Sequence, residues 1–152
     1  MIQAVLNMVL VFLAFGGFLL AFFINHKKKS NEPLVCPLKA HCDTVIHSDY
    51  SKIFGIPVEK LGMTYYGFIA LSYGFIMIFP ALYMPLIASG LLFATLCAFT
   101  FSIYLTLVQA FAIKSWCTWC LISAAICLSI FAIAASNSPL FYSLFSNIIL
   151  SL

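Results

Sequence analysis

Six cysteines give the sequence its clearest chemistry, and four of them form two close pairs. Cys117 and Cys120 lie three residues apart in WCTWC, shortly after Lys114 interrupts a long apolar run. Cys36 and Cys42 lie in VCPLKAHC, within the polar segment of the chain. A pair with two intervening residues at a helix start favours redox chemistry, because the helix dipole and unpaired amides stabilise a thiolate at the first cysteine. The two pairs could pass electrons by thiolate attack on a disulfide.

Static roles for the same four cysteines stay open. They could form structural disulfides, or together hold a zinc ion. Against zinc, five residues separate Cys36 from Cys42, whereas structural zinc pairs usually have about two to four. Lys114 either lowers the pKa of the Cys117 thiol or extends its ammonium to the membrane surface.

Other residues near the pairs have simpler interpretations. We expect Cys97 and Cys127, which lie inside apolar runs, to be small buried packing residues. His41 and His47 could tune thiol pKa values, but solvated loop histidines are the commoner case.

The composition indicates a membrane protein. Of 152 residues, 64% are hydrophobic and 7% charged, against about 25% charged in soluble domains. The net charge of +3 comes from lysines that are not spread as a nucleic-acid surface requires, so we expect no nucleic-acid partner. We predict an all-α integral membrane fold: a four-helix bundle that forms one domain over residues 1–152.

The apolar runs set the helices that must position the cysteines. A span needs about 20 apolar residues, and we expect spans near residues 2–25, 62–80, 86–110 and 115–135, the first of them an uncleaved helix. Pro80 and Pro85 mark a turn between the second and third. The tail, residues 136–152, contains a 13-residue apolar stretch, which we predict lies in the membrane interface; a truncated fifth span is the alternative.

The polar loop, residues 26–61, holds all four acidic residues and six of the seven lysines. Within it, SDYSKIFG predicts a short helix or turn, with Ser48 able to cap its start and Gly55 able to end it. Four spans place both termini on one side of the membrane. The loop and WCTWC then lie together on the other side, so the two cysteine pairs can meet.

Together these residues resemble the vitamin K epoxide reductase family, in particular its bacterial thiol-oxidising members. The resemblance rests on the two cysteine pairs, on Ser48 six residues after Cys42, and on FGIPV followed by Leu61-Gly62. It covers nearly the whole chain. It implies a four-helix bundle around a quinone, with the loop forming a lid and a half-helix over the site.

The resemblance also implies an electron path. Cys36 would accept electrons from a thioredoxin-like partner, Cys42 would pass them to Cys117, and Cys120 would reduce a ubiquinone or menaquinone. Ser48 would hydrogen-bond the quinone carbonyl, and we expect Phe54 and Trp119 to contribute to its site. From the sequence alone, Trp116 and Trp119 are most simply anchors at the membrane interface.

Two features of the sequence limit this transfer. The animal enzymes carry a tyrosine four residues after the second cysteine, where this chain has Ala124, which argues against vitamin K epoxide as the substrate. Many bacterial members are fused to a thioredoxin-like domain, whereas this chain stops at Leu152, so we expect any such partner to be separate. We also expect a monomer.

The expected function is oxidation of a partner dithiol by the membrane quinone pool, without metal or flavin. The alternatives are a quinone or vitamin K epoxide reductase that serves to make quinol, and a non-enzymatic membrane protein with structural disulfides or a four-cysteine zinc site. We expect the active site on the outer face of the cytoplasmic membrane. The lysines of the loop, including Lys27-Lys28-Lys29, favour the inverted orientation by the positive-inside rule.

Overall fold

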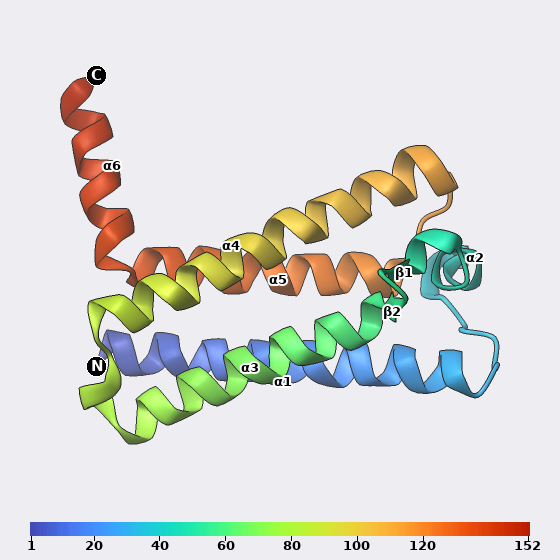
Figure 1. The fold of residues 1–152 in the computed structure, drawn as a ribbon, viewed down its shortest axis with the longest axis horizontal. Coiled ribbons are helices and arrows are strands. Elements are labelled where there is room, and N and C mark those ends of the chain that lie inside the picture. The colour runs from blue at the N-terminus through green and yellow to red at the C-terminus, as the bar shows by residue number, and fades with distance from the viewer.

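The computed structural model describes residues 1–152, and four long helices dominate it (Figure 1). These are α1 (Ile2–Lys29), α3 (Val58–Ile78), α4 (Pro85–Leu107) and α5 (Thr118–Asn137). A short 3₁₀ turn, Pro80–Leu82, joins α3 to α4, and a π-helix, Val108–Ile113, continues α4 toward α5. All four helices are long and apolar enough to cross a membrane. The predicted all-α membrane bundle is confirmed.

The bundle has an apolar core between its helices and a smaller buried cluster at the loop end, and it presents an apolar outer surface. Helix α1 packs against α3 and α5, and α4 packs against α5. The core residues are Leu10, Ala14, Tyr66, Ile69, Tyr73, Ile76, Leu91 and Ile130. Gly17 lets α1 and α3 approach closely, since a Cβ there would lie 2.6 Å from the Tyr66 ring. Only 25 of 152 residues are buried, so most apolar side chains face outward, as a lipid environment requires.

The helix ends differ from the predicted limits by a few residues. Helix α1 continues through the three lysines to Lys29, because cations at a helix C-terminus interact favourably with its dipole. Helix α3 begins at Val58, directly after Pro57, four residues before the predicted start. Helix α5 begins at Thr118, and Cys117 occupies its N-cap position.

The polar loop folds at one end of the bundle into short elements (Figure 1). These are a 3₁₀ turn (Pro37–Lys39), α2 (Cys42–Ile46), a second 3₁₀ turn (Asp49–Ser51), β1 (Lys52–Ile53) and β2 (Ile56–Pro57). The prediction that Gly55 ends a short helix is wrong. Phe54 and Gly55 have φ values of 51° and 80°, and they form the two-residue turn of the β1–β2 hairpin, which requires positive φ at both positions.

The C-terminal helix α6 (Pro139–Ser151) lies at the opposite end of the bundle. It runs across the long direction of the other helices rather than along it (Figure 1). With 13 residues it is too short for the roughly 30 Å hydrocarbon core, and its orientation is that of an interfacial helix.

Candidate redox site

The structure brings three of the four paired cysteines into one cluster beneath the loop. Cys36 and Cys42, here called the outer pair, are joined by a disulfide with a Cα–Cα distance of 5.9 Å. The sulfur of Cys117 lies within 4.8 Å of both outer sulfurs. Cys42 and Cys117 are 1% and 0% exposed, whereas Cys36 is half-buried. The outer pair therefore has one half-buried and one fully buried sulfur, and both lie close to Cys117.

Cys117 and Cys120, here called the inner pair, are positioned by the start of α5. The backbone N–H of Cys120 donates to the Cys117 sulfur at 3.4 Å. The backbone N–H of Cys117 donates to the side-chain oxygen of Gln109 at 3.2 Å. Gln109 is 4% exposed and belongs to the π-helix that precedes α5. A π-helix re-aims its side chains, and here it supplies the acceptor that fixes Cys117.

The surroundings of Cys117 favour its thiolate. A hydrogen bond from the Cys120 thiol lowers the pKa of Cys117, and hydrogen bonds from the backbone amides of Cys120 and Trp119 lower it further. Burial opposes this shift by raising the pKa. Lys114 is exposed, with φ of 54° at the end of the π-helix, and the causes of the shift lie in the CTWC turn itself. A cysteine of this kind is suited to nucleophilic exchange.

The two residues between the inner cysteines hold the loop in place. The Thr118 hydroxyl donates to the carbonyl of Pro37 at 3.1 Å, and the Trp119 indole N–H donates to the carbonyl of Val35 at 3.2 Å. These two carbonyls flank Cys36 in the sequence. The CTWC turn therefore both carries the inner pair and positions the outer pair above it.

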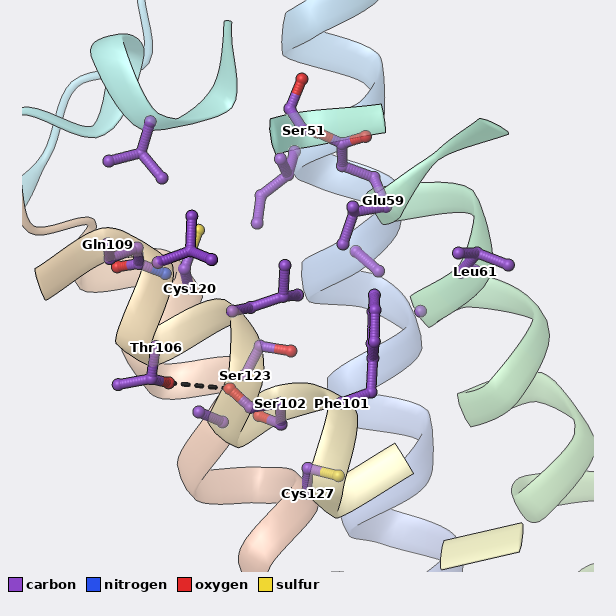
Figure 2. A pocket seen from close by; sticks show the side chains of 18 of the residues that line it. Ser51, Glu59, Leu61, Phe101, Ser102, Thr106, Gln109, Cys120, Ser123 and Cys127 are labelled. Atoms are coloured by element: carbon purple, nitrogen blue, oxygen red, sulfur yellow. Dashed lines mark hydrogen bonds between the residues drawn. The ribbon is translucent and has the colours of Figure 1, made fainter. Parts of the chain in front are cut away.

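Below Cys120 the bundle contains a partly open apolar cavity of about 430 Å³ (Figure 2). Eighteen of its 26 lining residues are hydrophobic, and its walls come from all four long helices and from the loop. Figure 2 shows Cys120 beside Gln109 on one side, and Glu59 next to Ser51 across the cavity. The remaining polar lining includes Ser48, Ser102, Thr106 and Ser123. Apolar walls with a few polar groups are typical of small-molecule sites.

The three residues predicted to contact the quinone differ in their position relative to the cavity. Ser48 lines the cavity, but its hydroxyl donates to the carbonyl of Val45 at 2.7 Å and caps no helix. Phe54 is 100% exposed at the hairpin turn. Trp119 packs against Phe23, with ring centroids 5.5 Å apart, beneath the loop. Neither Phe54 nor Trp119 is among the residues that line the cavity.

The remaining predicted residues lie outside the cysteine cluster. Cys127 is buried, as expected, but Cys97 is exposed on α4, because its position faces away from the neighbouring helices. His41 and His47 are both exposed, and His47 pairs with Asp43 at 3.3 Å.

Sequence reasoning missed two polar features of the site. The first is Gln109. It is the only amide side chain in the apolar run between residues 61 and 135, and this could have identified it as a candidate. The other is an ion pair between Lys28 and Glu59, whose atoms lie 3.0 Å apart. It ties the end of α1 to the start of α3, and Glu59 also lines the cavity. The loop carries many charges, so their pairing could not be read from spacing.

Comparison with known proteins gives the site its context. The sequence model of the Vitamin K epoxide reductase family matches residues 8–135, a range that includes both cysteine pairs, the second and third spans, and most of the first and fourth. A search of curated proteins found no matching sequence. Members of the family are membrane oxidoreductases that act with quinones. The match spans most of the chain, and the chain belongs to the vitamin K epoxide reductase family.

Proposed function

We propose that this protein oxidises the dithiol of a thioredoxin-like partner and passes the electrons to a membrane quinone. One observation carries the proposal: the Cys117 sulfur lies within 4.8 Å of the outer-pair sulfurs, while Cys120 lines the apolar cavity. The sulfur atoms thus form a continuous route from the half-buried Cys36 to the cavity. Two-electron thiol exchange is enough for every protein step of this route.

The exchange steps balance without another reactant. The partner dithiol reduces the outer disulfide at Cys36, and the partner leaves as a disulfide. The Cys42 thiolate then attacks Cys117 of the oxidised inner pair and releases Cys120. Cys36 attacks Cys42 of the resulting mixed disulfide, which re-forms the outer disulfide and frees the Cys117 thiolate. The inner dithiol gives two electrons to the quinone, forming the inner disulfide and a quinol.

The cavity suits a quinone as the second substrate. Its volume of about 430 Å³ falls in the range of about 300–1,000 Å³ for small-molecule sites. Its polar lining residues could donate hydrogen bonds to a quinone head, and the hydrophobic majority of the lining suits an apolar ring and chain. Ser48 remains a proposed donor to the quinone. It would have to exchange its bond to Val45 for one to the substrate.

The proposed orientation places the site on the outer face of the cytoplasmic membrane. The lysines of the loop oppose this by the positive-inside rule, but two of them are neutralised locally. Lys27 pairs with Glu32, and Lys28 pairs with Glu59. Reducing intact cells and then labelling thiols with a membrane-impermeant reagent checks this point. Labelling of Cys36 without permeabilisation supports the outward orientation, and labelling only after permeabilisation reverses it.

The central experiment compares two reductants and two variants. Purified protein is supplied either with dithiothreitol or with a reduced thioredoxin-like protein, and quinol formation is measured. Cys120→Ala should abolish quinone reduction with both reductants. Cys36→Ala should lose mainly the protein-driven reaction, because dithiothreitol can reduce the inner pair directly. Quinone reduction by Cys120→Ala at the native rate would refute the relay.

The same experiment separates the proposal from its rivals. Three cysteine sulfurs within 4.8 Å could hold zinc once the outer pair is reduced, so metal content is measured in the reduced protein. A static disulfide would not turn over with quinone, and a zinc site would release stoichiometric metal on oxidation. An enzyme that serves to make quinol would leave no protein substrate accumulating in reduced form in cells that lack it.

A further inference from the structure

Glu59 is a buried carboxylate with no part in the thiol relay. Its side chain is 8% exposed, and it lies at the start of α3. One carboxylate oxygen, Oε1, accepts a hydrogen bond from the Lys28 ammonium at 3.0 Å. The other, Oε2, is buried without any hydrogen-bond partner. Burying a charge is costly even when it is paired, and an unpartnered buried oxygen adds to that cost. A carboxylate buried at this cost points to a role beyond packing.

The position of Glu59 connects the cavity to the polar loop. It lines the same cavity as Cys120, and Figure 2 shows it at the end of the cavity next to Ser51. Behind it, Lys28 of α1 also donates to the Ser51 hydroxyl at 3.0 Å. The Lys28 side chain is 15% exposed, about twice the exposed fraction of Glu59, so Lys28 is the member of the pair nearer to solvent. Glu59 and Lys28 thus form a two-residue polar connection from the loop surface to the cavity wall.

No other carboxylate lines the cavity. The remaining ionisable residues in its wall are Tyr50, Tyr65, Tyr66, Cys120 and Cys127. Tyr66 already donates its hydroxyl to the carbonyl of Ser123 at 2.8 Å. Lys28 of α1 bonds to Glu59 and also to Ser51 of the loop, and Cys120 of α5 lines the same cavity as Glu59.

Quinone reduction creates a need for protons inside this apolar space. A quinol carries two protons, on oxygens at opposite sides of its ring. The Cys120 thiol can supply one of them. Cys117 reacts as a thiolate, so its proton has already gone to water and is not available in the cavity. The second quinone oxygen therefore needs a separate donor, and a positioned side chain serves this purpose better than water in an apolar site.

We propose that the Lys28–Glu59 pair supplies this second proton to the quinone. The proton moves from the Lys28 ammonium to Glu59 and from the Glu59 carboxyl to the quinone oxygen. The Cys120 thiol protonates the other oxygen, the inner pair closes to its disulfide, and both electrons enter the quinone. Lys28 then regains a proton from water at the loop. The inference rests on the proposed quinone reductase function and adds the proton path to it.

A purely structural role for the pair makes a different prediction. The pair joins α1 to α3, so removing it could simply loosen the loop. Glu59→Gln separates the two roles, because an amide oxygen still accepts from Lys28 but an amide cannot relay a proton. Glu32→Gln is the matched control: Glu32 also pairs with a lysine at the end of α1, but that pair is on the exposed surface.

The test follows single-turnover quinol formation in lipid nanodiscs, with dithiothreitol as reductant and a short-chain ubiquinone as substrate. Wild-type activity and its loss in Cys120→Ala are measured first; if either fails, the proposed function falls independently of Glu59. Glu59→Gln should then slow quinol formation by about 100-fold, within the usual range for general acids. Exchange between the two cysteine pairs should keep its native rate, and Glu32→Gln should match wild type.

Chemical rescue provides the decisive readout. Formate added to Glu59→Ala should raise the rate of quinol formation in proportion to the concentration of undissociated acid, because it replaces the missing proton donor. Formate should leave Glu59→Gln slow, since the amide fills the space. A native rate in Glu59→Gln overturns the proposal. So does a slow Glu59→Ala that formate does not rescue, because that result assigns the pair a structural role.

Discussion

The outer and inner cysteine pairs carry the same chemical groups in different surroundings. The outer pair lies in a loop of short turns, with one sulfur half-buried and the other 1% exposed. The inner pair lies at the start of a membrane helix, with Cys117 fully buried and Cys120 on the cavity wall. Because their positions differ, one pair is suited to meet a protein and the other a lipid-soluble molecule.

The comparison also shows where each pair gets its geometry. The outer pair depends on a local disulfide and on carbonyls held by Thr118 and Trp119. The inner pair depends on the π-helix through Gln109 and on the turn between its own cysteines. Substitutions that remove these contacts should affect one cysteine pair or the contact between the two pairs. Three such substitutions test the difference between the pairs.

The largest effect is expected at Gln109. Gln109→Leu leaves the buried N–H of Cys117 without its acceptor, which costs about 1–3 kcal/mol. Electron transfer from the outer to the inner pair should slow by about tenfold or more, as measured by quenched alkylation and mass spectrometry of the cysteine peptides. The control is Thr106→Val, which removes a hydroxyl bonded only within its own helix. Equal rates in the two variants would show that Gln109 does not position Cys117.

The next effect concerns the pH dependence of Cys117. Its pKa is lowered first by the hydrogen bond from Cys120, so Cys120→Ala should raise the pKa of Cys117 toward the ordinary thiol value. The thiolate fraction near neutral pH should then fall. The midpoint of Cys117 alkylation against pH, followed by peptide mass spectrometry, measures this shift. Cys127→Ala should leave the midpoint unchanged, and an unchanged midpoint in Cys120→Ala would contradict the assignment.

The sign of the corresponding stability change follows from linkage. A group whose pKa is lowered in the folded state stabilises that state above its unfolded pKa. The contribution is lost as the pH falls through the lowered pKa of Cys117. The stability of wild type should therefore decline more than that of Cys120→Ala over that range.

The smallest effect is expected at Thr118. Thr118→Val removes the bond to Pro37, worth about 0.5–1.5 kcal/mol, and so weakens the contact between the loop and the CTWC turn. Transfer between the pairs should slow by a few-fold, while quinone reduction by dithiothreitol should not change. Thr100→Val, whose hydroxyl bonds only within α4, serves as the control. If Thr118→Val lost both the transfer between the pairs and the quinone reduction by dithiothreitol, Thr118 would not act on the contact between the pairs alone.

Much of the architecture was predictable because apolar length determines membrane spans. Four runs predicted four helices, and their order placed both cysteine pairs at one end. The short elements were not predictable in the same way. Gly55 could end a helix or form a hairpin turn. Only the pairing of the strands on either side of it distinguishes the two, and the sequence does not show that pairing. Cys97 looked buried because the whole run is apolar, yet in a lipid-facing helix the exposed side is equally apolar.

The site was predictable at its cysteines and less so around them. Spacing identifies the inner pair, because its chemistry is local to one helix turn. Gln109, Lys28 and Glu59 act through contacts between segments distant in sequence, which no local pattern encodes. Trp119 could have faced the cavity or the loop. In the structure it donates a hydrogen bond to Val35 in the loop. This contact joins residues distant in sequence, so it could not be predicted from the sequence.

The most direct test of the relay is to trap its central contact. The double variant Cys36→Ala/Cys120→Ala leaves Cys42 and Cys117 from the two pairs, and equilibration in a glutathione redox buffer lets any close thiols form a disulfide. Mass spectrometry should find a Cys42–Cys117 disulfide, because these sulfurs lie within 4.8 Å. The companion variant Cys42→Ala/Cys117→Ala should form no Cys36–Cys120 disulfide. Absence of the Cys42–Cys117 disulfide, or equal yields in both variants, would contradict the proposed electron path.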